Sequence, residues 1–158
     1  MFRACFVAAV LLFVSAICAA QSTATCNLPD DRQVYIRYNP VSSKSERPAN
    51  GKPWAPGGSP MTLFTEAQLT LGNTTIPIGA YAVYPIPAKD KWSLVVNKNV
   101  TPGTAYDEKQ DLARIAMETD QIPQAADALE VAFAHYGLKC TLRIYFGKAA
   151  SFADFNAK

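Results

Sequence analysis

Three carboxylates lie close together in one polar stretch of the chain, at Asp107, Glu108 and Asp111, and Arg114 follows them. Paired carboxylates can share acid–base work or hold a hard cation. The spacing fits no cation-binding loop, and charged turns between strands commonly have this composition. The stretch therefore supports two interpretations: a charged turn, or the acid–base site of a small hydrolase or isomerase in which Asp107 and Asp111 act with Arg114.

The chain has few of the residues that other kinds of catalytic or metal site require. His135 is the only histidine, so a two-histidine metal site and a conventional pairing of serine with histidine are both disfavoured. It ends an apolar strand pattern beside a turn, which is typical of a structural histidine. Residues 57–60 (GGSP) lack the G-x-S-x-G spacing of a nucleophile elbow. We therefore assign no catalytic residue, no metal and no cofactor.

A binding role has candidate residues in two long polar connections. Residues 41–60 are rich in Ser, Pro, Gly, Lys and Asn, and Trp54 is their one large apolar side chain. Residues 98–109 form the second connection. If these loops converge, their aromatic rings offer stacking faces beside hydrogen-bond donors, whereas Trp54 could instead close one end of the core. The predicted binding residues are Trp54, Asn97, Lys98 and Tyr106.

The first twenty residues have the composition of a secretory signal peptide. Arg3 supplies a positive charge, residues 6–17 are apolar, and small residues precede the polar Gln21. We predict cleavage after Ala20, with cleavage after Ala24 as the alternative. The apolar run is too short for a convincing membrane span. We therefore expect an exported protein, periplasmic or extracellular, whose mature chain has no membrane span.

Length and charge indicate how many domains the mature chain has and which partners it does not attract. Removing residues 1–20 from 158 leaves about 138 residues, the usual size of one domain. We expect a polar N-terminal lead-in over residues 21–33 and a single domain over residues 34–158. The formal charge falls from +2 to +1, with 14 basic residues against 13 acidic ones. No electrostatic attraction to nucleic acid follows, so we expect an unknown small ligand or an envelope protein as partner.

The cysteine count changes with cleavage of the signal peptide. Cys5 and Cys18 leave with that segment, and Cys26 and Cys140 remain. An even number of cysteines in an oxidising compartment favours a disulfide. We predict that Cys26 and Cys140 are bonded to each other, tying the lead-in to a late strand; two free thiols are the alternative.

Alternation of apolar and polar residues predicts short β-strands along the mature chain. We expect them at residues 33–39, 62–71, 76–83, 92–97, 112–119, 129–135 and 140–146, with a short edge segment around residues 152–155. Gly72-Asn73 predicts a hairpin turn, and Pro123 predicts another turn. Trp92 has the parity of a core residue. About eight short strands without a helical period predict an all-β, antiparallel β-sandwich or partly closed barrel.

Three longer patterns occur in order along the chain. Residues 69–81 (LTLGNTTIPIGAY) combine a short apolar strand, a glycine turn and Pro-x-Gly-x-Tyr. Residues 92–98 run from a tryptophan to an Asn-Lys pair, and residues 106–114 carry Tyr-Asp-x-x-x-Asp followed by Arg. Over roughly residues 34–155 the chain resembles the secreted bacterial family catalogued as domain of unknown function 2911. The resemblance implies the fold and export; the family has no established activity.

One stretch departs from that family's pattern. The family usually carries Trp-Arg-Thr-Gly-Ala-Asn-Glu-Ala-Thr ahead of the hairpin, whereas residues 54–62 read WAPGGSPMT. The Trp, the Gly and the final Thr persist, but Ala55, Ser59 and Pro60 replace the Arg, Asn and Glu. Whatever those polar groups do elsewhere, this chain lacks them. The sequence thus favours an exported, non-catalytic β-sandwich module with a binding or envelope-associated role, with the loop-carboxylate enzyme as the alternative.

Overall fold

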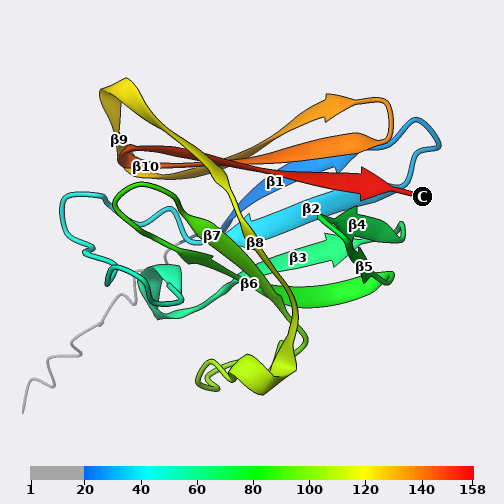
Figure 1. Cartoon of the computed structure of the whole chain (residues 1–158), viewed down its shortest axis with the longest axis horizontal. Helices are drawn as coiled ribbons and strands as arrows, with labels where there is room; N and C mark the ends of the chain where they lie inside the picture. Colours follow the sequence, from blue (N-terminus) through cyan, green and yellow to red (C-terminus); the bar gives the residue numbers. More distant parts are fainter. Residues whose placement is uncertain (1–19) are drawn as a thin grey trace, which may run out of the picture.

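The structure is a computed structural model, which describes residues 20–158 as two antiparallel sheets facing each other (Figure 1). The six-stranded sheet has the order β1 (Ser22–Asn27), β2 (Gln33–Tyr38), β3 (Met61–Thr65), β6 (Gly79–Ile86), β7 (Ser93–Asn97) and β8 (Asp111–Ala116). The four-stranded sheet has the order β5 (Thr74–Ile76), β4 (Leu69–Leu71), β10 (Lys139–Ala157) and β9 (Glu118–Tyr136). The predicted all-β antiparallel sandwich is confirmed, and its sheets do not close into a barrel.

The main core lies between the sheets because alternate residues of each strand point inward. In β2, for example, Val34, Ile36 and Tyr38 are buried. β6 is buried on both faces along most of its length, since two long loops cover its outer side. These loops contain the short 3-10 turns η1 (Pro56–Gly58) and η2 (Glu108–Gln110). Trp92 is buried as its parity predicted.

The segment expected to be a polar lead-in, residues 21–33, contains a strand instead. β1 pairs in register with β2, from Ser22 opposite Tyr38 to Asn27 opposite Gln33. Its inward residues, Ala24 and Cys26, are buried. Alanine and cysteine are weak local signals of a strand, so pairing with β2 decides the conformation here.

Two stretches expected to be single strands each divide between the two sheets. Residues 62–71 form β3 and β4, with a bend where Thr65 Oγ1 accepts a hydrogen bond from the backbone N–H of Ala67. Residues 76–83 likewise divide between β5 and β6 at Pro77, which has no N–H to donate to a ladder. Local alternation continues across both bends, so it does not reveal the change of sheet. The hairpin at Gly72-Asn73 is confirmed.

The last two strands form a long bent ribbon in place of several short strands. β9 continues through Pro123, where a turn was expected, and no helical turn forms after it. The predicted edge segment at residues 152–155 belongs to β10, which lies inside its sheet between β4 and β9. Register shifts flank Gly147, so the ribbon bends there, at the end of the molecule opposite the C-terminus (Figure 1). Residues 123–125 of β9 are exposed, so their composition resembles that of a turn although they belong to a strand.

The predicted disulfide is confirmed between Cys26 of β1 and Cys140 of β10. Their Cα atoms are 6.1 Å apart, and 114 residues separate them in the chain. Because β1 and β10 belong to different sheets, the bond ties the two layers of the sandwich together.

The predicted signal peptide lies outside the described residues, except for its final Ala20. Within residues 20–158, none of the helical segments is long and apolar enough to span a bilayer. The disulfide is consistent with an exported protein, since such bonds persist in oxidising compartments.

Candidate functional site

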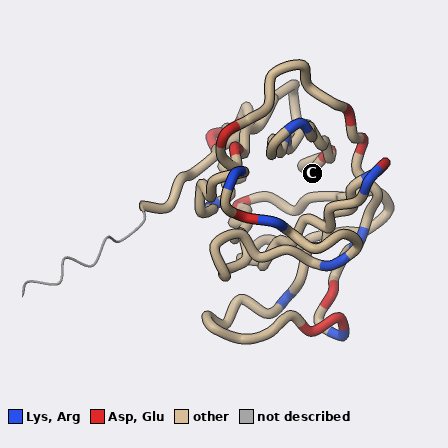
Figure 2. Tube along the Cα trace, turned by 90° about the vertical axis from the view of Figure 1, so that its left-hand side faces the viewer, with Lys and Arg blue, Asp and Glu red and all other residues tan. Residues whose placement is uncertain are grey.

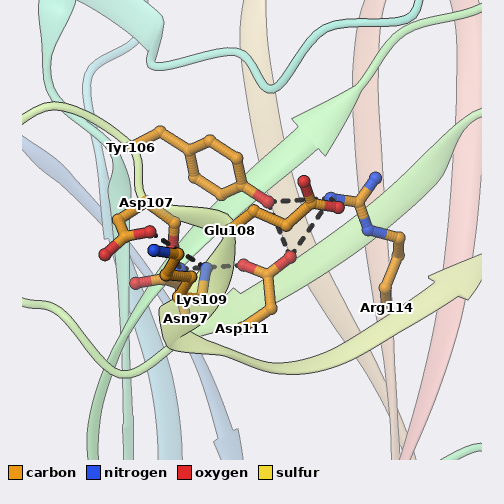
Figure 3. A network of polar contacts seen from close by, with 7 residues as sticks. All are labelled: Asn97, Tyr106, Asp107, Glu108, Lys109, Asp111 and Arg114. Atoms are coloured by element: carbon orange, nitrogen blue, oxygen red, sulfur yellow. Dashed lines mark hydrogen bonds and ion pairs between the residues drawn. The ribbon is translucent and has the colours of Figure 1, made fainter.

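Several of the sequence-predicted residues meet in one polar network between β7 and β8 (Figure 3). Asn97 Nδ2 donates to Asp111 Oδ1 at 2.8 Å and to the backbone oxygen of Asp107 at 2.9 Å. Tyr106 Oη donates to Asp111 Oδ2 at 2.6 Å. Arg114 Nη2 donates to the same carboxylate oxygen at 3.1 Å and to Tyr106 Oη at 2.8 Å. Asp111 therefore accepts hydrogen bonds on both oxygens.

The local sequence folds this loop around η2. The backbone N–H of Lys109 donates to Asp107 Oδ1 at 3.0 Å, which caps the turn. The backbone N–H of Lys98 donates to the carbonyl of Gln110 at 2.8 Å, so the two ends of the loop are joined. The side chain of Lys98 is exposed. Glu108 adds an ion pair with Arg114 at 3.4 Å.

The network changes the acidity of Tyr106. Its partial burial, the hydrogen bond to Asp111 and the negative charge of that carboxylate raise the pKa of Tyr106 to about 12. The hydroxyl therefore stays protonated and donates to Asp111 at neutral pH. These contacts anchor the loop of residues 98–110 on β7 and β8. They also engage both oxygens of Asp111, one of the carboxylates considered for acid–base catalysis.

Trp54 lies in the main core, with 6 % of its surface exposed. Its Nε1 donates to Glu46 Oε1 at 2.8 Å. The ring contacts Phe146, with centroids 4.6 Å apart, and meets Trp92 edge-on at 6.4 Å. Its ring faces are covered by protein, so Trp54 closes the core, as the structural interpretation expected.

The two long loops nevertheless reach the same outer surface of the six-stranded sheet. Ala55 from one loop and Tyr106 from the other cover a small apolar cluster of Ala82, Tyr84, Ile86 and Val95. The ring of Tyr106 meets that of Tyr84 edge-on, with centroids 5.1 Å apart. Both loops therefore pack against the outer face of the six-stranded sheet. Trp54 lies in the main core and Tyr106 packs on the outer cluster, so the two rings do not form a shared stacking site.

A different concave region lies on the outer side of the β9–β10 ribbon, and we call it the β10 groove. It consists of two cavities of about 550 and 480 Å³ that share Arg143. The first is lined by Glu118, Lys139, Thr141, Arg143, Phe152, Asp154 and Asn156, among others. The second is lined by Gln124, Glu130, Phe133, Arg143 and Tyr145, among others. Strand alternation places most of these β10 side chains away from the core.

Side chains from the two arms of β10 hold one another in the β10 groove. Asp154 accepts a hydrogen bond from Thr141 Oγ1 at 2.6 Å and pairs with Lys139 Nζ at 3.3 Å. Tyr145 meets Phe152 edge-on, with ring centroids 6.4 Å apart. Arg143 has no ion-pair partner among residues 20–158. Its guanidinium is exposed between the two cavities.

Sequence reasoning missed the β10 groove because its residues are far apart in the chain. Phe152 lies opposite Glu118 in the β9–β10 ladder, and the bend of the ribbon brings Arg143 to the same cavity. The alternation of residues 141–145 identifies an outward face but not the concave shape. Within the described chain, no group of three His, Cys, Asp or Glu side chains is placed to hold a metal ion.

Charge is mixed over the whole described trace, with basic and acidic positions interspersed along strands and loops (Figure 2). Along residues 21–158, 14 basic residues stand against 13 acidic ones, so neither sign predominates to steer a strongly charged partner. The geometry of individual sites is therefore a better guide to function than overall charge.

These features define a disulfide-bonded antiparallel β-sandwich domain with a hydrogen-bonded loop network and an outward-facing groove. The family model described as protein of unknown function (DUF2911) matches residues 20–151. Because this match covers most of the chain, the chain belongs to that family, as its sequence patterns predicted. No curated protein and no solved structure matches it.

Proposed function

We propose that this chain is an exported, non-catalytic β-sandwich module that binds a ligand in the β10 groove. The observation that carries the proposal is Arg143, an unpaired guanidinium shared by two cavities of about 550 and 480 Å³. Both volumes lie within the range of about 300–1,000 Å³ that is typical of ligand sites. A planar guanidinium offers several hydrogen-bond donors in a fixed arrangement and so gives the ligand a defined anchor.

The contacts of the loop network support a non-catalytic role. Asp111 is engaged by Asn97, Tyr106 and Arg114, and Asp107 caps the turn of its own loop. These groups stabilise the loop in the structure described here. The alternative, a hydrolase or isomerase acting through Asp107, Asp111 and Arg114, would use groups that are already engaged in those contacts.

Export is supported by the composition of the first twenty residues and by the Cys26–Cys140 bond. Mass spectrometry of the protein recovered from the periplasm or medium of an expressing bacterium should give an N-terminus at Gln21. An N-terminus at Thr25 would support the alternative cleavage after Ala24. An intact Met1 on the recovered protein would contradict removal of a signal peptide.

A thermal-shift screen with a library of small metabolites tests the binding site. A molecule that binds only the folded state raises the melting temperature by mass action. We expect the rise to disappear in Arg143→Ala and to persist in Arg37→Ala, an exposed arginine on the outer face of the other sheet. A ligand effect that survives Arg143→Ala but is lost in Asp111→Asn would instead place the site at the loop network.

A further inference from the structure

We infer that the ligand of the β10 groove is an uncharged oligosaccharide. This inference rests on the proposed function, since it names the chemical class that the same groove accepts. It is argued from the charge balance of the groove, the shape of its polar groups and the position of its aromatic rings.

Charge balance disfavours a strongly charged ligand. Both signs line the groove: the basic side chains are Lys139 and Arg143, and the acidic ones are Glu118, Glu130 and Asp154. A multivalent anion would meet these carboxylates, and a cation would meet the two basic groups. An uncharged ligand avoids both repulsions and can use all of these groups as hydrogen-bond partners.

Most of the polar side chains in the groove end in flat, forked groups. Carboxylates accept on two oxygens, a guanidinium donates from several nitrogens, and amides do both. Forked groups of this kind fit the adjacent hydroxyls of a sugar ring, which donate and accept in pairs. The forked groups are those of Glu118, Gln124, Glu130, Arg143, Asp154 and Asn156.

Aromatic rings line both of the cavities that share Arg143. Phe152 lines the first cavity and Tyr145 the second, and both are half-buried. Their edge-on contact joins the two cavities next to Arg143. Ring faces pack against the C–H faces of sugars, burying apolar surface without a charge. Because one cavity lies on each side of this aromatic contact, we expect a ligand that extends over both, such as a chain of two or more sugar units.

A peptide is the less favoured occupant. Peptides that add to a sheet do so at an exposed edge strand, where backbone groups are free. The β10 groove lies on the face of the ribbon, where alternate side chains of β10 point outward (Lys139, Thr141, Arg143 and Tyr145). It therefore offers mainly side chains, which recognise the hydroxyls and ring faces of a saccharide.

An array of di-, tri- and tetrasaccharides tests the inference on protein purified after expression of the full chain. The array should contain neutral hexose, pentose and N-acetylhexosamine oligomers, uronic-acid oligomers and a peptide pool. We expect binding to neutral oligosaccharides, weakened about tenfold or more by Arg143→Ala and by Phe152→Ala. Arg37→Ala and Phe64→Ala are matched controls on the other sheet and should bind like the parent.

The outcomes separate this inference from the proposed function. If no oligosaccharide binds but a metabolite from the screen does so through Arg143, the saccharide inference is overturned and the binding module stands. Preference for uronic-acid oligomers or peptides also overturns it. If neither assay gives a response that depends on Arg143, both proposals fail. Saccharide binding unchanged in Arg143→Ala and Phe152→Ala would place the sugar site outside the groove.

Discussion

Asn97, which belongs to the pattern of residues 92–98, has a structural role in the fold. It is 1 % exposed, and its amide nitrogen donates to Asp111 and to the backbone of Asp107. Its side-chain oxygen accepts from the backbone N–H of Asn99 at 2.9 Å. A buried amide without such partners would be costly. The requirement at this position is therefore for a side chain that joins β7 to the following loop.

Tyr106 should make stability depend on pH in the alkaline range. Its pKa is raised from the ordinary value near 10 to about 12, chiefly by partial burial and then by Asp111. A raised pKa favours the protonated form in the folded state, so this contribution is present below about pH 10 and is lost towards pH 12. In urea unfolding across this range, Tyr106→Phe should lose stability less steeply than the parent.

The control for this measurement is Tyr136→Phe, because Tyr136 is 83 % exposed and outside the network. It should follow the parent curve. Burial also raises the pKa values of Tyr81 and Tyr84, and these tyrosines are present in parent and variants alike. Identical slopes for Tyr106→Phe and the parent would show that the hydroxyl is not coupled to folding.

Trp54 gives a prediction about stability. Trp54→Ala should lower the free energy of unfolding by about 3–5 kcal/mol, because it empties a large core position against Phe146 and Trp92. Chemical denaturation measures the loss, and Tyr136→Ala should change stability little. A cost below about 1 kcal/mol would mean that the ring is not part of the core in solution.

At the scale of elements, the bend of the β9–β10 ribbon creates the β10 groove. Gly147 lies between two register shifts and has a φ of 57°, in the left-handed region that glycine adopts readily. A Cβ at this position would have no neighbour within 4 Å. A loss of stability on substituting Gly147 would therefore come from the strained backbone conformation and not from a steric clash.

Gly147→Ala should destabilise the domain by about 1–2 kcal/mol, the cost of left-handed backbone for a residue with a Cβ. Gly147→Asn is the matched variant and should cost less, because asparagine tolerates this conformation better. Both are measured by chemical denaturation. Equal stability of Gly147→Ala and the parent would contradict the bend at this residue.

At the scale of the whole molecule, the Cys26–Cys140 bond closes most of the domain into one loop. In the chain-entropy model a loop with a sequence separation of 114 stabilises by roughly 4–5 kcal/mol. The double variant Cys26→Ala/Cys140→Ala should lose stability of this order, and reduction of the parent should have a similar effect. Thiol titration of the denatured, unreduced, processed protein should find no free sulfhydryl; two would contradict the bond.

The features that depend on neighbouring residues could be predicted from the sequence. The alternation of Val34, Ile36 and Tyr38 predicted a half-buried strand, because the side-chain period of a strand is two. Gly72-Asn73 predicted its hairpin, because tight turns require backbone that glycine adopts. The two cysteines left after removal of the predicted signal peptide favoured a bond between Cys26 and Cys140. The all-β class and the family followed from such local patterns repeated along the chain.

Which segments share a sheet, and which side chains meet, depends on contacts between residues that are distant in the chain. Residues 62–71 keep one alternation although they cross from one sheet to the other, since a local period carries no information about the partner strand. Trp54 became a core residue because Phe146 and Trp92 cover it. Arg143 and Phe152 line one groove because the ribbon bends between them, and local alternation does not reveal where a ribbon bends.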